Sequence, residues 1–98
     1  SKIDQDKFLD LLSRPIAKFQ RYPRLAQRRG WEGKTVLNIE LTGTGDLISK
    51  NISISSGFKI LDNEAMKMID RAMPLPVSSE LLSNKILTIY IPIKFEIN

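Results

Sequence analysis

Apolar residues occupy every second position in two stretches of the chain, a spacing typical of β-strands with one buried face. In the first stretch, 34–41, the inward positions are expected to be Thr35, Leu37, Ile39 and Leu41. The second stretch, from Lys85 to Ile97, alternates more regularly. Its apolar positions are Leu87, Ile89, Ile91, Ile93, Phe95 and Ile97. We predict a strand over each stretch, and we expect the last strand to cover the core.

The glycine-rich sequence TGTGD at 42–46 follows the first predicted strand. It predicts a hairpin turn, because glycine adopts positive φ at little cost. The chain is then expected to return in a strand over 47–55, with serine and asparagine facing solvent. In that strand we expect Ile48, Ile52 and Ile54 to face the core.

A helix is predicted after this hairpin from an apolar stripe with helical spacing. The stripe consists of Leu61, Ala65, Met68, Ile69 and Ala72. We expect Asp62 to be the N-cap of this helix, because a carboxylate there accepts hydrogen bonds from free backbone amides. Pro74 and Pro76 are expected to end it.

Two further helical segments are predicted before the first strand. The polar residues at 4–6, two of them acidic, precede apolar residues at 8, 9, 11 and 12, which indicates an amphipathic helix. Pro15 is expected to interrupt that helix, with another helical turn running from Ser13 toward Phe19. A short helix is expected over 23–29, with Pro23 at its first position and Gly30 as its C-terminal cap.

The order of these elements predicts the α+β fold class, with an antiparallel sheet of about three strands and helices packed on one face. At 98 residues the chain has room for one modest core, so we expect one compact domain overall. Within it we distinguish an N-terminal helical segment, 1–21, from the main domain, 22–98.

The composition argues against catalysis and against insertion in a membrane. The chain has no histidine and no cysteine, which removes the commonest general base, metal ligands and thiol chemistry. The acidic residues are scattered, mostly at turns, caps or outward positions. We therefore predict no catalytic residue, no metal site and no cofactor. The longest apolar stretch, 86–93, is too short to span a bilayer.

The net charge of +4 is concentrated between residues 14 and 34. The cations there are Arg14, Lys18, Arg21, Arg24, Arg28, Arg29 and Lys34. One interpretation is a nucleic-acid surface on which Phe19, Tyr22 and Trp31 stack bases. The interpretation we favour is a solvated face with these three aromatic residues largely buried, and docking on an acidic protein surface is a third. We therefore expect no nucleic-acid partner.

Five short motifs in a fixed order resemble the C-terminal domain of the TonB family of periplasmic energy transducers. The motifs are Tyr22-Pro23, Ala26, Glu32-Gly33, Ser55-Ser56-Gly57 and Leu61-Asp62-Asn63-Glu64-Ala65. The resemblance runs from about Tyr22 to the end of the chain. Two departures concern the paired prolines, which lie in MPLP, and Phe19 to Arg21, which lacks the polar, proline-containing run of the best-known members.

This resemblance implies a periplasmic domain of an inner-membrane-anchored protein in a Gram-negative bacterium. It implies two partners, namely TonB-dependent outer-membrane transporters and a proton-driven inner-membrane motor that would act through a spacer and anchor outside this sequence. The transporter would present a short extended peptide, the TonB box. Docking would couple proton-motive force to the uptake of iron chelates, cobalamin or metal ions.

The residues themselves favour docking by strand addition. Pro92 has no N–H to donate, so the last strand is expected to be an edge strand or to contain a bulge, and an edge strand is a template for an added strand. We expect a peptide to pair with Thr88 and Tyr90, before Pro92. The resemblance adds a second contact, formed by Phe19, Gln20, Arg21, Tyr22 and Pro23. The alternatives are a nucleic-acid-binding module, a self-associating domain that forms a weak homodimer through its own edge and, last, an enzyme.

Overall fold

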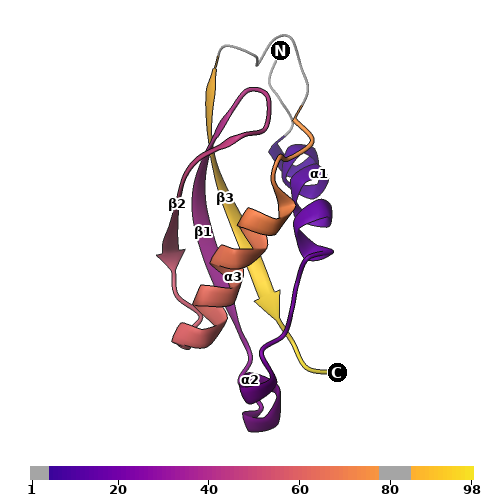
Figure 1. The fold of residues 1–98 in the computed structure, drawn as a ribbon, viewed down its shortest axis with the longest axis vertical. Helices are drawn as coiled ribbons and strands as arrows, with labels where there is room; N and C mark the ends of the chain where they lie inside the picture. The colour runs from indigo at the N-terminus through magenta and orange to yellow at the C-terminus, as the bar shows by residue number, and fades with distance from the viewer. Residues whose placement is uncertain (1–4, 78–84) are drawn as a thin grey trace.

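The computed structural model describes residues 5–77 and 85–98, which form a three-stranded antiparallel sheet with helices on one face (Figure 1). The elements are α1 (Gln5–Ala17), α2 (Arg24–Arg29), β1 (Gly33–Thr42), β2 (Leu47–Ile54), α3 (Lys59–Ala72) and β3 (Ile86–Phe95). The strand order is β2-β1-β3. The predicted α+β class is therefore confirmed. The sequence also predicts a short turn around residues 78–82, and this turn and Asp4 lie outside the described residues.

β1 and β3 pair without interruption, from Gly33 opposite Phe95 to Thr42 opposite Ile86. In both strands every second side chain packs against the helices, as predicted, except that β3 ends at Phe95 and Ile97 is 38% exposed. The fully or nearly buried residues of these strands are Thr35, Leu37, Ile39, Leu41, Ile89, Ile91, Ile93 and Phe95. The core thus lies between the sheet and the two longer helices, α1 and α3.

β2 does not follow the predicted alternation. Ile48, Ile52 and Ile54 were expected to face the core, and they are 48%, 41% and 60% exposed. The β1–β2 register shifts twice, which places Ile54 opposite Val36 on the uncovered face and Ile48 at the second shift. Ile52 keeps the helix-facing side, opposite Leu37, and is exposed because β2 is the edge strand of the sheet. Lys50 instead turns toward α3, where it donates to the Met66 carbonyl (3.1 Å) and forms an ion pair with Asp70.

α1 is one helix that continues through Pro15, so the predicted interruption is wrong. Leu12 and Ile16, on either side of this proline, are fully buried. Their burial offsets the backbone hydrogen bond that proline cannot make. Within the described residues, α1 and the other helices are each too short or too polar to cross a membrane.

Asp62 is not the N-cap of α3, because the helix begins at Lys59 and Phe58 is its N-cap. The Asp62 carboxylate instead lies at the end of the sheet where β1 begins and β2 ends. It accepts hydrogen bonds from the Thr35 hydroxyl (2.7 Å), from the Ser56 amide and hydroxyl (2.9 and 2.8 Å) and from the Ser55 hydroxyl. This carboxylate joins β1, the segment after β2 and α3. The apolar stripe predicted for α3 is confirmed, since all five of its residues are buried.

The hairpin turn between β1 and β2 is confirmed, and it needs a glycine for two reasons. Gly45 has φ +94°, and a Cβ there would lie 2.0 Å from the Leu75 carbonyl oxygen. In return, the Leu75 amide donates to the Gly45 carbonyl (2.9 Å). The turn is thus fixed to the segment that follows α3. Gly30 caps α2 in the left-handed conformation, as predicted. Pro23 was expected at the first helical position, but its backbone is extended and it is the N-cap of that helix.

Candidate peptide-docking edge

β3 lies at one edge of the sheet, where its open side has no neighbouring strand among the described residues (Figure 1). The edge position predicted from Pro92 is therefore confirmed. The opposite edge is β2, in which two irregularities interrupt the ladder. Bulges make an edge a poor template for further pairing. β3 is accordingly the better edge for an added strand.

The backbone groups that face the open side of β3 follow from two observations. Pro92 has no N–H, and the carbonyl oxygen of Lys94 accepts a hydrogen bond from the side-chain amide of Gln20 (Nε2 to O, 2.8 Å). In an antiparallel strand the N–H and C=O of one residue point to the same side, and that side alternates. Thr88 and Tyr90 therefore also turn their N–H and C=O groups to the open side.

The side chains of these outward residues lie on the sheet face that the helices leave uncovered. Thr88, Pro92 and Lys94 are exposed, and Tyr90 is 54% exposed. The residues between them are buried against the helices. An added strand would therefore pair with β3, whose inward-facing side chains are packed in the core.

The segment from Phe19 to Arg21 is held on α3 by its backbone. Arg71 donates from Nη1 to the Phe19 carbonyl (3.0 Å), and the Arg21 amide donates to Glu64 Oε2 (3.1 Å). Arg71 and Glu64 also bind each other through two contacts of 2.6 and 3.2 Å. The hydrogen bond with Glu64 raises the pKa of Arg71 further above its ordinary value. Gln20 lies between these two anchors, with its side chain on the open edge of β3.

Tyr22 fixes the end of this segment against the sheet. Its ring meets Phe95 edge to face, with centroids 5.5 Å apart, and its hydroxyl donates to the Trp31 carbonyl. Burial, with a smaller contribution from the Glu32 carboxylate, raises the pKa of Tyr22. The Tyr22-Pro23 motif thus connects α2 to the end of β3.

The three aromatic residues of the basic segment are less buried than predicted. Phe19 is 40% exposed, while Tyr22 and Trp31 are half-buried. Phe19 follows the end of α1 in a segment anchored by its backbone, so its ring is not drawn into the core. Trp31 stacks on Phe58, with centroids 5.0 Å apart, and lies 5.7 Å from the Arg29 guanidinium carbon.

The predicted site residues form two groups that meet at one point. Thr88, Tyr90 and Pro92 lie along the edge, and the 19–23 segment reaches that edge beyond Pro92, where Gln20 bonds Lys94. The sequence prediction missed the residues that support the second group, Glu64 and Arg71. Their spacing of seven residues, two helical turns, places them on one face of α3 and was the available signal.

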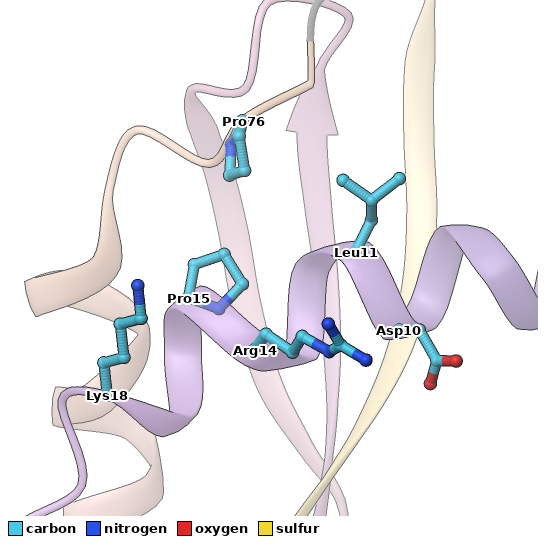
Figure 2. A pocket seen from close by; sticks show the side chains of 6 residues that line it. All are labelled: Asp10, Leu11, Arg14, Pro15, Lys18 and Pro76. Atoms are coloured by element: carbon cyan, nitrogen blue, oxygen red, sulfur yellow. The ribbon is translucent and has the colours of Figure 1, made fainter.

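A separate hollow of about 480 Å³ lies along the exposed face of α1 (Figure 2). It is lined by Asp10, Leu11, Arg14, Pro15, Lys18 and Pro76. None of the predicted site residues lines it. Leu11 and the two prolines form its apolar part, and the charged side chains extend along its rim. The hollow is therefore a feature of the helical layer and not of the docking edge.

The comparisons with known proteins all indicate the same family. The sequence model described as "Gram-negative bacterial TonB protein C-terminal" matches residues 19–97. Protein TonB of Pseudomonas putida is 33% identical over 86 residues, 87% of this chain and 35% of that protein. Protein TonB of Pasteurella multocida is 30% identical over 86 residues, 88% of this chain and 32% of that protein. The chain thus spans about a third of the length of these curated relatives.

Solved structures agree with the sequence comparison. The solution structure of the Helicobacter pylori TonB C-terminal domain superposes with a TM-score of 0.81 at 26% identity, over 95% of this chain and 83% of that one. The C-terminal domain of HasB superposes with a TM-score of 0.57 at 25% identity, over 97% of this chain and 71% of that one. Since the family model covers most of the sequence and the fold agrees, the chain belongs to the family of TonB C-terminal domains of Gram-negative bacteria.

Proposed function

We propose that this chain is the periplasmic coupling domain of an inner-membrane-anchored TonB protein, and that it docks on the TonB box of outer-membrane transporters by adding a strand to β3. The observation that supports this function best is the outward set of backbone groups at Thr88 and Tyr90. Those groups lie on an edge whose opposite side is fully paired with β1. Through a spacer and anchor, the domain would transmit force from a proton-driven inner-membrane motor.

Weak docking is expected from this geometry. Each backbone hydrogen bond formed with a peptide contributes about 1 kcal/mol net, because both partners give up bonds to water. A peptide of about five residues therefore binds with modest affinity through its backbone alone. Such affinity suits a coupler that must release its transporter after each transport event.

The other functions considered have less support. TonB proteins are transport-coupling proteins and not known enzymes, and family membership favours protein docking over a nucleic-acid-binding module. A second copy of the chain could pair its own β3 with this edge. That homodimer would compete with peptide docking, because both use the same backbone groups.

The proposal can be tested by titrating the ¹⁵N-labelled protein with a TonB-box peptide and following its amide signals. We expect the largest shifts at Thr88 and Tyr90, with smaller shifts at Tyr22. Shifts confined to the turn at 42–46, with Thr88 and Tyr90 unchanged, would contradict strand addition. Sedimentation equilibrium without peptide provides the test for the homodimer, since edge pairing between copies makes the apparent mass rise with concentration.

A matched pair of variants isolates the backbone contribution. Tyr90→Pro removes the outward N–H and the aromatic ring, whereas Tyr90→Ala removes only the ring. Proline is tolerated at this strand edge, as Pro92 shows. We expect the proline variant to bind peptide about fivefold more weakly than the alanine variant, the equivalent of one hydrogen bond. Equal affinities of the two variants would place the peptide elsewhere.

A further inference from the structure

The open edge of β3 is already occupied at one position in the free protein. The Gln20 side-chain amide donates to the Lys94 carbonyl (2.8 Å), which belongs to the outward-facing set of backbone groups. This contact joins residues 74 positions apart in the sequence. It takes the same acceptor that an added strand would need in order to continue past Pro92.

The backbone on both sides of Gln20 is fixed. The Phe19 carbonyl accepts from Arg71 at 3.0 Å, and the Arg21 amide donates to Glu64 at 3.1 Å. Glu64 is 8% exposed. Because its flanking peptide groups are held on α3, Gln20 loses little further conformational freedom in keeping its amide on the edge.

Pro92 and Gln20 act at neighbouring outward positions. Pro92 offers an acceptor but no donor, and the acceptor of Lys94 is taken. Before them, Ile86, Thr88 and Tyr90 each offer both groups. An added strand therefore finds both backbone groups of each outward residue up to Tyr90 and one acceptor at Pro92. At Lys94 it finds an N–H beside an acceptor that Gln20 already occupies.

On the basis of the proposed docking function, we infer that Gln20 sets the end of the docking edge: an added peptide strand pairs with β3 from Ile86 to Pro92 and stops at Lys94. Gln20 is thus a specificity-determining residue for the length and register of the bound peptide. A peptide that extended further would first have to displace the Gln20 amide, so that pairing with the Lys94 carbonyl only exchanges one hydrogen bond for another.

The inference predicts how affinity depends on peptide length. Peptides that share one TonB-box core and are lengthened stepwise along β3 toward Lys94 should gain affinity until they pass Pro92 and then level off in the unaltered protein. In Gln20→Ala, affinity should continue to rise for the peptide that reaches Lys94, by about fivefold for one additional backbone bond. Gln20→Glu should behave similarly, because a carboxylate cannot donate to the Lys94 carbonyl.

Gln27→Ala is the matched control, since Gln27 is exposed on α2, away from the edge. It should show the same plateau as the unaltered protein. The Lys94 amide signal provides a second readout. It should shift on addition of the longest peptide in Gln20→Ala but not in the unaltered protein or in Gln27→Ala.

The outcomes separate this inference from the docking function. A Lys94 shift and a continued gain in affinity in the unaltered protein, with Thr88 and Tyr90 also shifting, would overturn the role of Gln20 and leave strand addition in place. If no peptide shifts Thr88 and Tyr90 in any variant, strand addition itself is wrong, and the inference about Gln20 is overturned with it.

Discussion

The carboxylate of Asp62 joins three parts of the chain through four hydrogen bonds. It accepts hydrogen bonds from Thr35 on β1 and from Ser55 and Ser56 after β2, while its own backbone belongs to α3. Burial alone would raise the pKa of Asp62, but the hydrogen bonds from Ser55, Ser56 and Thr35 outweigh it, and the pKa is lowered. The ionised form is therefore the one that stabilises the fold.

Asp62→Asn tests that conclusion through its pH dependence. At pH 7 we expect a loss of about 1–3 kcal/mol in unfolding free energy, because the amide accepts fewer bonds and brings an unwanted donor. Since the folded pKa is lowered, the carboxylate's contribution is complete above the unfolded value of about 3.9 and disappears as pH falls through the folded value. Urea unfolding should thus show the two proteins converging below about pH 4.

Asp70→Asn is the control for this experiment. Asp70 forms an ion pair with Lys50 in which its own side chain is 56% exposed, so its removal should cost no more than about 1 kcal/mol. A difference between Asp62→Asn and the unaltered protein that stays constant from pH 7 to pH 3 would show that the carboxylate is not the cause.

Gly45 is the second residue with a specific structural requirement. Gly45→Ala combines a positive φ with a close contact to the Leu75 carbonyl, whereas Gly57→Ala has the same φ of +94° and nothing within 4 Å. Placing an alanine at positive φ costs about 1–2 kcal/mol of unfolding free energy by itself. We expect Gly57→Ala to lose about that amount in urea unfolding and Gly45→Ala to lose clearly more. Equal losses would mean that the turn moves away from Leu75 without cost.

At the scale of elements, the sequence predicts those parts in which one periodicity holds from end to end. β1, β3 and α3 each keep a single apolar face, so the positions that they bury are predictable, whereas the start of α3 at Lys59 is not. β2 is different, because its two shifts of register arise from its pairing with β1. The spacing of its isoleucines in the sequence gives no sign of these shifts. A strand at the edge of the helical layer can expose Ile54 without losing its ladder.

The edge position of β3 was predictable for a similar reason, and the side-chain contact at its end was not. Pro92 indicates an edge strand because it lacks a backbone N–H. Since successive residues of a strand turn their backbone groups to opposite sides, Thr88 and Tyr90 then face the open side with Pro92. The Gln20 contact with Lys94 joins distant residues, and no local pattern encodes it. Likewise, Asp62 has the sequence context of an N-cap, but its partners come from three other positions of the fold.

Core packing of β3 can be tested at Ile91, which is fully buried. Ile91→Ala should lower the unfolding free energy by about 2–5 kcal/mol through lost burial and the cavity left behind. Ile54→Ala on β2, where the side chain is 60% exposed, is the control and should change stability by about 0.5 kcal/mol or less. A thermal midpoint unchanged in Ile91→Ala would mean that the inner face of β3 is wrongly placed.

At the scale of the whole molecule, the described chain is elongated, with principal extents of 46 × 22 × 21 Å. The docking edge runs along this length, and α2 lies at one end of it (Figure 1). α1 and α3 cover one face of the sheet, and the other face remains open. Such a shape lets a strand be added along β3 without rearranging the core.

We propose that residues 1–21 and 22–98 form one folding unit, although the family match begins only at residue 19. α1 supplies Leu12 and Ile16, both fully buried, to the same core as α3 and β3. Leu12→Ala should therefore cost about 2–5 kcal/mol of unfolding free energy. Leu11→Ala, one position earlier and 59% exposed, should cost about 0.5 kcal/mol or less.

Removal of residues 1–18 extends this test from one side chain to the whole helix. The deletion uncovers the core residues that α1 protects, so the thermal midpoint should fall further than in Leu12→Ala and remain a single transition. It also leaves the Gln20 contact and the open side of β3 in place, so peptide binding should persist below the lowered midpoint. If the shortened chain unfolded at the same temperature as the full one, α1 would be an appendage, and residues 22–98 would be the folding unit by themselves.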